Sequence, residues 1–279
     1  TPAAVNPWTS SNTTIATVNN AGVITGVNPG TVTITYTNSN GCSNSATITV
    51  NALPTISGTL TICDGATTTL TGSGTPAAVN PWTSSNTTVA TVSATGVVTG
   101  QNAGTTVITY TNNNGCQVTA TVTILAQPTI TGPANVCVGS TITLTGSGTP
   151  AAANPWTSSN TAVATISNAG VVTGITNGTV TITYTNSAGC SRTANVTVRN
   201  LPNITGTLTV CVGATTDLNG SGTPAATNPW TSSNTSIATV DNNGIVTGIA
   251  TGTVTITYTN TFGCSRSVNV TVNALPTIT

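Results

Sequence analysis

The feature that most constrains this chain is a strict internal repeat. Its tryptophans are Trp8, Trp82, Trp156 and Trp230, so each number is the previous one plus 74. Its tyrosines keep the same interval, as Tyr36, Tyr110, Tyr184 and Tyr258. A strict period is the first evidence to use when a fold is inferred from sequence. Because this period is long for a solenoid repeat and sufficient for a small domain, we predict separate domains, each with its own core.

The predicted domains follow one another with short joints between them. We expect a partial repeat without its N-terminal strands over 1–52, complete repeats over 53–126, 127–200 and 201–274, and the start of another over 275–279. Each joint carries a proline, at Pro54, Pro128, Pro202 and Pro276. Proline fixes its own φ and favours extended geometry in the preceding residue, so we expect semi-rigid joints. We also expect both ends of the chain to belong to a longer array.

Within each repeat, apolar residues alternate with threonine. In Thr31–Thr37, Val32, Ile34 and Tyr36 share one face, and Ser45–Val50 alternates in the same way after a turn-forming loop. Alternation over five to eight residues indicates a half-buried strand. Around seven such strands per repeat, with no helical period, predict an all-β fold of tandem Ig-like β-sandwich domains in an elongated, bead-on-string array.

The composition excludes several classes of function. The chain has three basic and three acidic residues and no histidine. Acid–base catalysis needs titratable partners, nucleic-acid binding needs clustered Lys and Arg, and calcium needs several carboxylates, whereas Asp64, Asp217 and Asp241 stand alone. No apolar run is long enough for a membrane helix. We therefore predict no enzyme activity, no catalytic residue, no cofactor or metal, no nucleic-acid partner and no direct insertion into a membrane.

The cysteines form two series with the same period. One series comprises Cys42, Cys116, Cys190 and Cys264, and the other comprises Cys63, Cys137 and Cys211. Two cysteines per repeat without histidine favour a disulfide over zinc, and hence an oxidising compartment. A small core needs a covalent staple, so we expect pairing within each repeat. That pairing gives Cys63–Cys116, Cys137–Cys190 and Cys211–Cys264, with the partner of Cys42 upstream.

A second pairing across each joint stays open at this point. It would join Cys42 to Cys63, Cys116 to Cys137, and Cys190 to Cys211. Sequence alone does not decide disulfide connectivity. The aromatic residues have two interpretations as well. The tryptophans could stack on sugars, but a tryptophan on a strand of an Ig-like domain packs in the core near the disulfide, and each tyrosine is expected in the core with its hydroxyl at the rim.

The order of several segments resembles a known family. Trp82-Thr-Ser-Ser-Asn-Thr-Thr-Val-Ala-Thr-Val92 is followed by Gly96-Val-Val-Thr-Gly100 and Gly104-Thr-Thr-Val-Ile-Thr109. This pattern resembles the bacterial Ig-like domain of group 2 and recurs in all four repeats. The added cysteines and the Leu-Pro joints are similar to repeats of giant surface adhesins of Bacteroidota, including gliding-motility adhesins exported by the type IX system.

The resemblance implies an extracellular protein at the cell surface. We predict a stalk or fibre segment of a large adhesin, which extends a binding tip away from the cell. Its partners are then the neighbouring repeats, with lateral association into filaments left open and any glycan or substratum contact unknown. Two alternatives remain at this stage: an array of weak carbohydrate sites that bind by avidity, and a spacer in a secreted enzyme.

Overall fold

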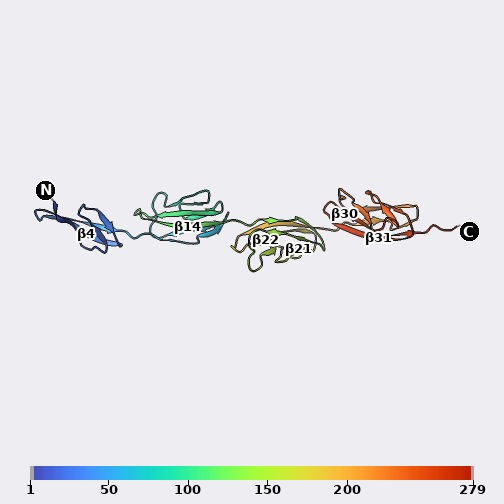
Figure 1. The fold of residues 1–279 in the computed structure, drawn as a ribbon, viewed down its shortest axis with the longest axis horizontal. Helices are drawn as coiled ribbons and strands as arrows, with labels where there is room; N and C mark the ends of the chain where they lie inside the picture. The colour runs from blue at the N-terminus through green and yellow to red at the C-terminus, as the bar shows by residue number, and fades with distance from the viewer. Residues whose placement is uncertain (1–2, 278–279) are drawn as a thin grey trace. The chain divides into compact units, whose positions relative to one another are not determined.

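The structure, a computed structural model, describes residues 3–277, and all regular elements in this range are β-strands (Figure 1). The chain divides into two compact units, residues 1–126 and 127–279. The first unit contains the partial first repeat and the second repeat, the second unit contains the third and fourth repeats, and each unit is described by itself. No helix long and apolar enough to cross a membrane occurs in the described range.

The third repeat illustrates the architecture. Its strands are β15 (Ile130–Thr131), β16 (Asn135–Cys137), β17 (Thr141–Thr143), β18 (Thr145–Gly146), β19 (Trp156–Ser158), β20 (Ala164–Ile166), β21 (Val171–Gly174), β22 (Gly178–Thr185) and β23 (Ser191–Arg199). One sheet has the order β16-β23-β22-β19, and a second has the order β17-β21-β20. A short pair, β15 and β18, completes the repeat. All pairs are antiparallel except β16 and β23, which run parallel.

The core lies between these sheets and follows from the alternation in β22. Val180, Ile182 and Tyr184 are buried, whereas the threonines between them are partly or fully exposed. The neighbouring strand β23 adds Val196 and Val198 to the same core. Burial of each such side chain stabilises the fold by about 1.5–3 kcal/mol. The threonine faces are suited to strands because β-branched residues fit a pleated, half-buried surface.

The second and fourth repeats have the same plan. The second contains β6 (Ile56–Ser57), β7 (Thr61–Cys63), β8 (Thr67–Thr69), β9 (Thr71–Gly72), β10 (Trp82–Ser84), β11 (Ala90–Val92), β12 (Val97–Gly100), β13 (Gly104–Thr111) and β14 (Gln117–Leu125). The fourth contains β24 (Ile204–Gly206), β25 (Thr209–Cys211), β26 (Thr215–Gly220), β27 (Trp230–Ser232), β28 (Ala238–Val240), β29 (Ile245–Gly248), β30 (Gly252–Thr259) and β31 (Ser265–Asn273). In the fourth, β24, β26, β29 and β28 form one sheet.

The first repeat contains only the later part of this plan. Its strands are β1 (Ala3–Ser10), β2 (Ala16–Val18), β3 (Ile24–Gly26), β4 (Gly30–Asn38) and β5 (Ser43–Val50). The segment equivalent to β7, β8 and β9 would precede Thr1 in the 74-residue register. Each apolar cluster in the described residues draws on one repeat alone, including the small cluster of the first.

The strands predicted from alternation are present. β4 and β5 contain the two segments chosen from the first repeat, and β13 contains Thr106, Ile108 and Tyr110 on its buried face. The buried Thr106 replaces the valine found at this position in the other repeats. Its hydroxyl is satisfied by the backbone N–H of Asn86, at 3.0 Å, and by the hydroxyl of Ser84, at 3.1 Å. A polar residue in the core is therefore paired, as burial requires.

Candidate functional site at the repeat junction

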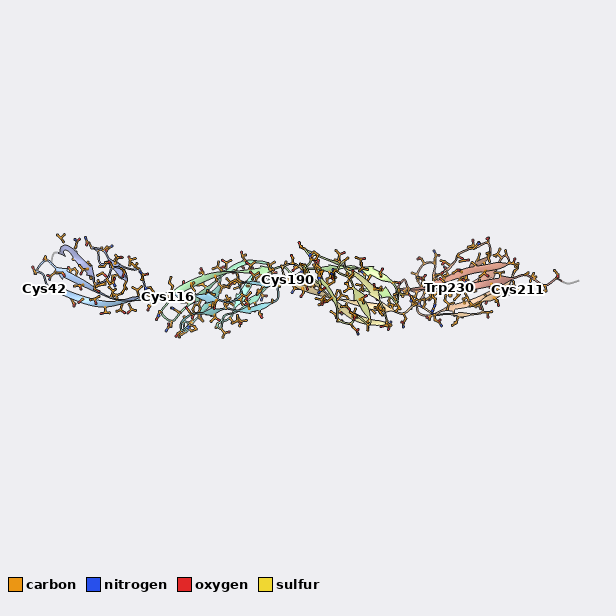
Figure 2. The ribbon with its side chains drawn as sticks, turned by 90° about the horizontal axis from the view of Figure 1, so that it is seen from below. Cys42, Cys116, Cys190, Cys211 and Trp230 are labelled. Carbon is orange, nitrogen blue, oxygen red and sulfur yellow. A yellow bond between two sulfur atoms is a disulfide. The ribbon has the colours of Figure 1, made fainter. Side chains whose placement is uncertain are left out.

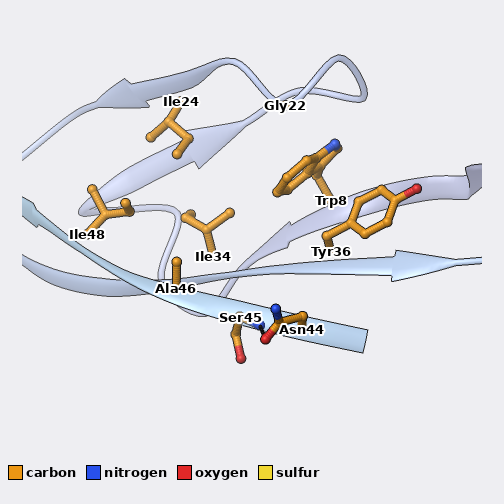
Figure 3. Close-up of a pocket in the computed structure, with 9 residues that line it drawn as sticks. All are labelled: Trp8, Gly22, Ile24, Ile34, Tyr36, Asn44, Ser45, Ala46 and Ile48. Atoms are coloured by element: carbon orange, nitrogen blue, oxygen red, sulfur yellow. Dashed lines mark hydrogen bonds between the residues drawn. The ribbon is translucent and has the colours of Figure 1, made fainter. Parts of the chain in front are cut away.

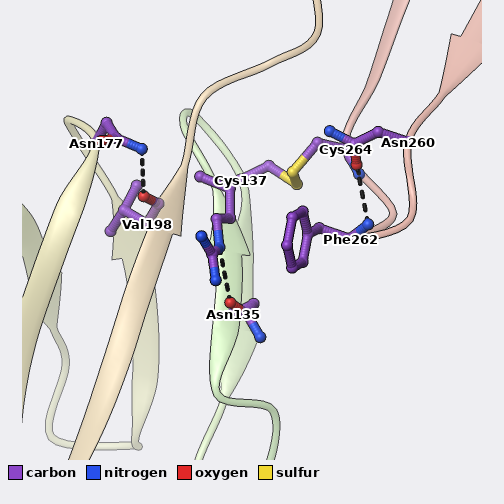
Figure 4. Close-up of a disulfide and its surroundings, with 8 residues drawn as sticks. Asn135, Cys137, Asn177, Val198, Asn260, Phe262 and Cys264 are labelled. Atoms are coloured by element: carbon purple, nitrogen blue, oxygen red, sulfur yellow. Dashed lines mark hydrogen bonds between the residues drawn. A yellow bond between two sulfur atoms is a disulfide. The ribbon is translucent and has the colours of Figure 1, made fainter. Parts of the chain in front are cut away.

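The structure joins the third and fourth repeats with a disulfide between Cys137 and Cys264 (Figure 4). Their Cα atoms lie 5.6 Å apart, within the usual range for a disulfide. The two residues are 127 positions apart in the sequence, and neither belongs to the apolar cluster of its repeat. The bond therefore links one repeat to the next rather than stapling a single core.

Cys137 is positioned by the parallel pairing of the first sheet. It ends β16, where it lies opposite Arg199, the last residue of β23. The backbone N–H of Val138 donates to the carbonyl of Arg199 at 2.9 Å. The Arg199 side chain returns to the same strand, because its Nε donates to the Asn135 Oδ1 at 2.9 Å. These bonds hold Cys137 at the end of the repeat where the chain leaves for the next one.

Cys264 is positioned by the hairpin loop between β30 and β31. The Asn260 Oδ1 accepts the backbone N–H groups of Phe262 and Cys264, at 3.0 and 3.1 Å. The Asn260 N–H donates to the Cys264 carbonyl at 3.0 Å. Gly263 has a φ of 77°, in the left-handed region that glycine adopts without steric cost. Asparagine side chains commonly stabilise such turns, and here the loop presents a buried Cys264 to the preceding repeat.

A charged side chain contacts the same hairpin. The Arg199 guanidinium carbon lies 4.1 Å from the centre of the Phe262 ring, which is the geometry of a cation–π interaction. Such an interaction contributes about 0.5–1 kcal/mol at an exposed site. Phe262 is 48% exposed and is the only phenylalanine of the sequence. The junction of the third and fourth repeats thus combines one covalent bond with one ring contact.

The predicted pairing within each repeat is wrong. The strand cysteine of a repeat lies beside the C-terminal end of the last strand, as Cys137 does beside Arg199. The hairpin cysteine immediately precedes that same strand, as Cys190 precedes β23. A strand of this length separates the two ends by roughly 30 Å, whereas a disulfide needs Cα atoms within about 7 Å. The two cysteines of one repeat therefore cannot meet.

The alternative pairing across each joint is also contradicted. Cys42, Cys116 and Cys211 carry free thiols (Figure 2), although that pairing assigned a partner to each. Cys116 and Cys211 were expected in disulfides under the first pairing as well, so both expectations fail there. Cys63 and Cys190 are disulfide-bonded, as are Cys137 and Cys264. The two cysteine series were recognised correctly, but their connectivity and the bonded state of Cys116 and Cys211 were wrong.

The aromatic residues form cores, as predicted for the complete repeats. Trp82, Trp156 and Trp230 are 5–7% exposed, and Tyr110, Tyr184 and Tyr258 are at most 1% exposed. The rings of Trp156 and Tyr184 lie 4.6 Å apart between centroids. The Tyr184 hydroxyl donates to the Gly148 carbonyl at 3.3 Å, at the rim of the core. Burial raises the pKa of Tyr258 above its ordinary value. The disulfide, however, lies at the junction and not beside the tryptophan.

In the first repeat the same aromatic pair lines an open groove of about 500 Å³. Trp8 and Tyr36 lie side by side along it, with Ile24, Ile34 and Ile48 beyond them (Figure 3). In the complete repeats a buried leucine, Leu70, Leu144 or Leu218, belongs to the core beside the tryptophan. This leucine has no counterpart within residues 1–52. The groove is therefore the unfilled part of an Ig-like core.

A shallow recess recurs beside the tryptophan of each complete repeat. In the third repeat it measures about 220 Å³ and is lined by Leu144, Gly146, Pro150, Trp156 and Tyr184, among others. Ligand sites usually enclose about 300–1,000 Å³. Trp156 is only 6% exposed, so it offers no open ring face on which a sugar could stack. The recess is a poor carbohydrate site by size and by access.

Titratable groups do not gather anywhere in the described residues. No group of three or more His, Cys, Asp or Glu residues that could hold a metal occurs within residues 3–277. Backbone N–H groups, first that of Ile245, lower the pKa of Asp241, which is a turn residue. Its carboxylate accepts from Ile245 N–H at 2.8 Å and from Asn243 N–H at 2.9 Å. This carboxylate shapes a turn.

Sequence reasoning missed the residues that build the junction. An asparagine four residues before the hairpin cysteine recurs as Asn38, Asn112, Asn186 and Asn260. This spacing could have indicated that the loop fixes the cysteine, because asparagine side chains organise turns. Arg199 and Phe262 gave no such signal, since each occurs in one repeat alone. Their contact depends on which repeat follows which.

The comparison with known families agrees with the fold. The chain matches the family described as Bacterial Ig-like domain (group 2) over residues 3–50, 54–122, 127–198 and 202–272. These matches cover most of the chain, and the chain therefore belongs to that family. The chain is an all-β protein of tandem Ig-like repeats, as the sequence predicts.

Two proteins of known sequence and one solved structure are similar to this chain or to a part of it. Ice-binding protein 1 of Shewanella frigidimarina (strain NCIMB 400) is 32% identical over 95% of this chain and 34% of its own length. The 3-O-alpha-D-galactosyl-alpha-L-arabinofuranosidase of Bifidobacterium longum subsp. longum is 49% identical over 22% of this chain and 6% of its own length. The crystal structure of invasin, a bacterial integrin-binding protein, aligns with a TM-score of 0.33 and 18% identity, over 90% of this chain and 66% of that one.

Proposed function

We propose that this chain is a structural spacer of an extracellular bacterial surface protein, in which covalently linked Ig-like repeats hold a functional part away from the cell. The observation that carries the proposal is the disulfide between Cys137 and Cys264, which connects two repeats instead of stabilising one. A spacer that must keep its reach gains from such a bond, because the bond limits movement at the joint.

The properties of the repeats support the same role. Each core is closed by its own aromatic pair and aliphatic residues, and the outer faces are mostly threonine, serine and asparagine. With only three basic and three acidic residues in the chain, neighbouring repeats do not attract each other by opposite charge. Uncharged polar faces of this kind favour solvation over collapse of one repeat onto another. Disulfides also fit an oxidising, extracytoplasmic location.

Small-angle X-ray scattering of the oxidised chain tests the spacer proposal. A compact protein of this length has a radius of gyration of about 19 Å. Four repeats in a line, each with strands of roughly 30 Å, would give roughly 35–40 Å by the same measure. The spacer proposal predicts the larger value. A value near that of a compact protein would reject it, because folded-back repeats cannot extend anything.

Two other functions are distinguishable by experiment. An array of weak carbohydrate sites would show glycan-array binding that Trp82→Ala abolishes while the fold persists, and the spacer proposal predicts no binding by the unchanged chain. A spacer within a secreted enzyme is favoured by the relative from Bifidobacterium, an arabinofuranosidase by name that this chain matches over 6% of its length. The coding sequence on either side of this segment decides that question, since a neighbouring catalytic domain would replace the adhesin proposal.

The finer proposal concerns the parent protein. We propose a giant adhesin of the kind found in Bacteroidota, in which many such repeats carry a binding tip and take part in gliding motility after type IX export. Further repeats and a terminal sorting domain in the flanking sequence would support it. Their replacement by a membrane anchor of another export system would reject the type IX part and leave the spacer role intact.

A further inference from the structure

The bond between Cys137 and Cys264 uses two half-sites that every complete repeat contains. The strand half-site is the cysteine at the end of the first parallel strand, as in β16. The hairpin half-site is the cysteine that directly precedes the last strand, as Cys264 precedes β31. In the observed bond the strand half-site belongs to one repeat and the hairpin half-site to the next, at a sequence separation of 127.

Both half-sites have the same local geometry in the other repeats. Cys190 and Cys116 each donate a backbone N–H to an asparagine Oδ1 at 3.0 Å, and Cys42 does the same. The residue after the strand cysteine donates to the end of the last strand in each case, as Asp64 does to Leu125 at 2.8 Å and Val212 does to Asn273 at 3.0 Å. The chain therefore repeats the half-sites as faithfully as it repeats its cores.

We propose that the bond of residues 137 and 264 is one rung of a ladder, and that Cys211 forms the next rung with the hairpin cysteine of a repeat that follows at the same separation of 127.

The same rule accounts for the free thiols. Cys42, Cys116 and Cys211 are the cysteines whose partner at this separation falls outside residues 1–279. Cys211, which is exposed, would form a disulfide with the hairpin cysteine of a repeat that follows at the same period. Cys42 and Cys116 would form disulfides with strand cysteines of preceding repeats. The partner of each free thiol is therefore a further Ig-like repeat with the same two half-sites, and not a metal or a small molecule.

Formation of each rung is an oxidation of two thiols. One thiolate attacks a disulfide oxidant of the compartment, a protein or small-molecule disulfide, and forms a mixed disulfide. The second cysteine then displaces the oxidant, which leaves as a dithiol with the two electrons and two protons of the original thiols. A chain in which the next repeat has folded presents both half-sites together, so the exchange closes the rung between neighbours.

A rung of the ladder adds a second covalent connection between two neighbouring repeats. Residues 200–203 connect β23 to β24 by backbone alone, and the rung of Cys137 and Cys264 forms a second covalent path around this joint. The joint near Pro54 has no such path in this chain, because the strand cysteine that would bypass it precedes Thr1. This difference provides a matched control.

Cleavage of the joints in the full chain tests the ladder. A recognition sequence for a site-specific protease is inserted after Asn51 or after Asn200 in two separate variants, and the oxidised products are separated by electrophoresis without reduction. We expect the cut after Asn200 to leave one covalent species that reduction splits into two fragments. The cut after Asn51 should release its fragment without reduction.

Two results would overturn the ladder. Release of fragments without reduction after the Asn200 cut would contradict the observed rung. Thiol labelling of the unmodified folded chain gives an independent answer that no insertion affects. The ladder predicts label on Cys42, Cys116 and Cys211 only, whereas pairing within repeats predicts label on Cys42 alone.

Extension of the chain tests the role of Cys211. A copy of residues 201–274 is appended after Ala274 in the same register, so that its hairpin cysteine lies as far beyond Cys211 as Cys264 lies beyond Cys137. We expect Cys211 to become protected from labelling and the strand cysteine of the appended copy to be labelled instead. Continued labelling of Cys211 in the folded, oxidised product would show that the half-site does not select the next repeat.

Discussion

The first and third repeats contain the same aromatic pair and differ in what covers it. Trp156 and Tyr184 are buried in the third repeat, whereas Trp8 and Tyr36 are partly exposed and line the groove of the first. The centroids of the two rings lie 4.6 Å apart in the third repeat and 4.8 Å apart in the first. The pairing of the two strands therefore fixes the distance between the two rings. The leucine and glycine of the early strands then cover the rings and close the core.

The comparison explains why Gly146 is required. A side chain at this position would collide with the ring of Tyr184, so only glycine lets the early strands approach the aromatic pair. Gly170 has a φ of 80° and would place a Cβ against the Leu144 carbonyl. For its equivalent in the first repeat, Gly22, the atoms nearest to such a Cβ belong to the Trp8 ring. The same glycine is thus more constrained where the core is closed.

Replacement of the tryptophan should give the largest difference between the first and third repeats in the loss of stability. Trp156→Ala should lower the free energy of unfolding of the third repeat by about 3–5 kcal/mol, the usual cost for a buried tryptophan. Trp8→Ala should cost the first repeat less, because part of the ring already faces solvent. Hydrogen exchange of the β22 and β4 amides measures both effects. Equal losses would show that the early strands do not close the core.

Truncation of Leu144 should make the third repeat resemble the first. Leu144→Ala should cost about 2–5 kcal/mol through lost burial and the cavity that it leaves. It should also raise the accessibility of Trp156 to a soluble quencher, in a background where the other tryptophans are replaced by phenylalanine. Leu201→Ala serves as the control, because Leu201 is 39% exposed in the joint. An unchanged Trp156 would contradict the proposed role of Leu144.

A smaller loss of stability is expected when a methyl group is placed against the ring of the tyrosine. Gly146→Ala should destabilise the third repeat by about 1–3 kcal/mol, as overpacking of a core does. The cost should fall when Tyr184→Leu removes the ring, so the two substitutions together should destabilise the repeat by less than the sum of their separate costs in a double-mutant cycle. The free energies come from chemical denaturation followed by the same amides. Additive losses would mean that the ring is not the obstacle.

The smallest expected effect is a loss of stability of the fourth repeat at acid pH. The backbone N–H of Ile245 holds the pKa of Asp241 below its ordinary value of 3.8, so its contribution to stability is present above that value and is lost as the pH falls through the folded pKa. The third repeat has Ser167 at this place, which accepts from Val171 N–H at 3.2 Å and does not titrate there.

Thermal unfolding between pH 5 and pH 2 measures this difference. The fourth repeat should lose slightly more stability than the third, and Asp241→Asn should remove the excess. A fourth repeat that responds to acid no more than the third does would contradict the role of the carboxylate. The expected shift is small because Asp241 is solvent-exposed, where electrostatic contributions are weak.

Much of the fold follows from local sequence. The alternation of Val180, Ile182 and Tyr184 with threonine predicts β22 and its buried face, because side chains along a strand point to opposite sides. The period predicts that each repeat has its own core. The aromatic pair is predictable as core as well, since a tryptophan opposite a tyrosine on neighbouring strands can bury both rings.

The disulfide pairing was not accessible in the same way. It depends on the parallel pairing of β16 with β23, two strands far apart in the sequence, which carries no local signature. Once this pairing is known, the distance between Cys137 and Cys190 along β23 excludes a bond within the repeat. The backbone of Asn154 is a second feature that the sequence did not predict. Asn154 directly precedes a proline, and a residue in that position favours extended geometry, but the φ of Asn154 is 46°.

Mapping of disulfide-linked peptides from the oxidised, unreduced chain tests the link between repeats most directly. A spacer of covalently coupled repeats predicts a peptide pair that contains Cys137 and Cys264. A pair that contains Cys137 and Cys190 would show instead that each repeat is stapled to itself, and the proposed coupling of neighbouring repeats would then be wrong.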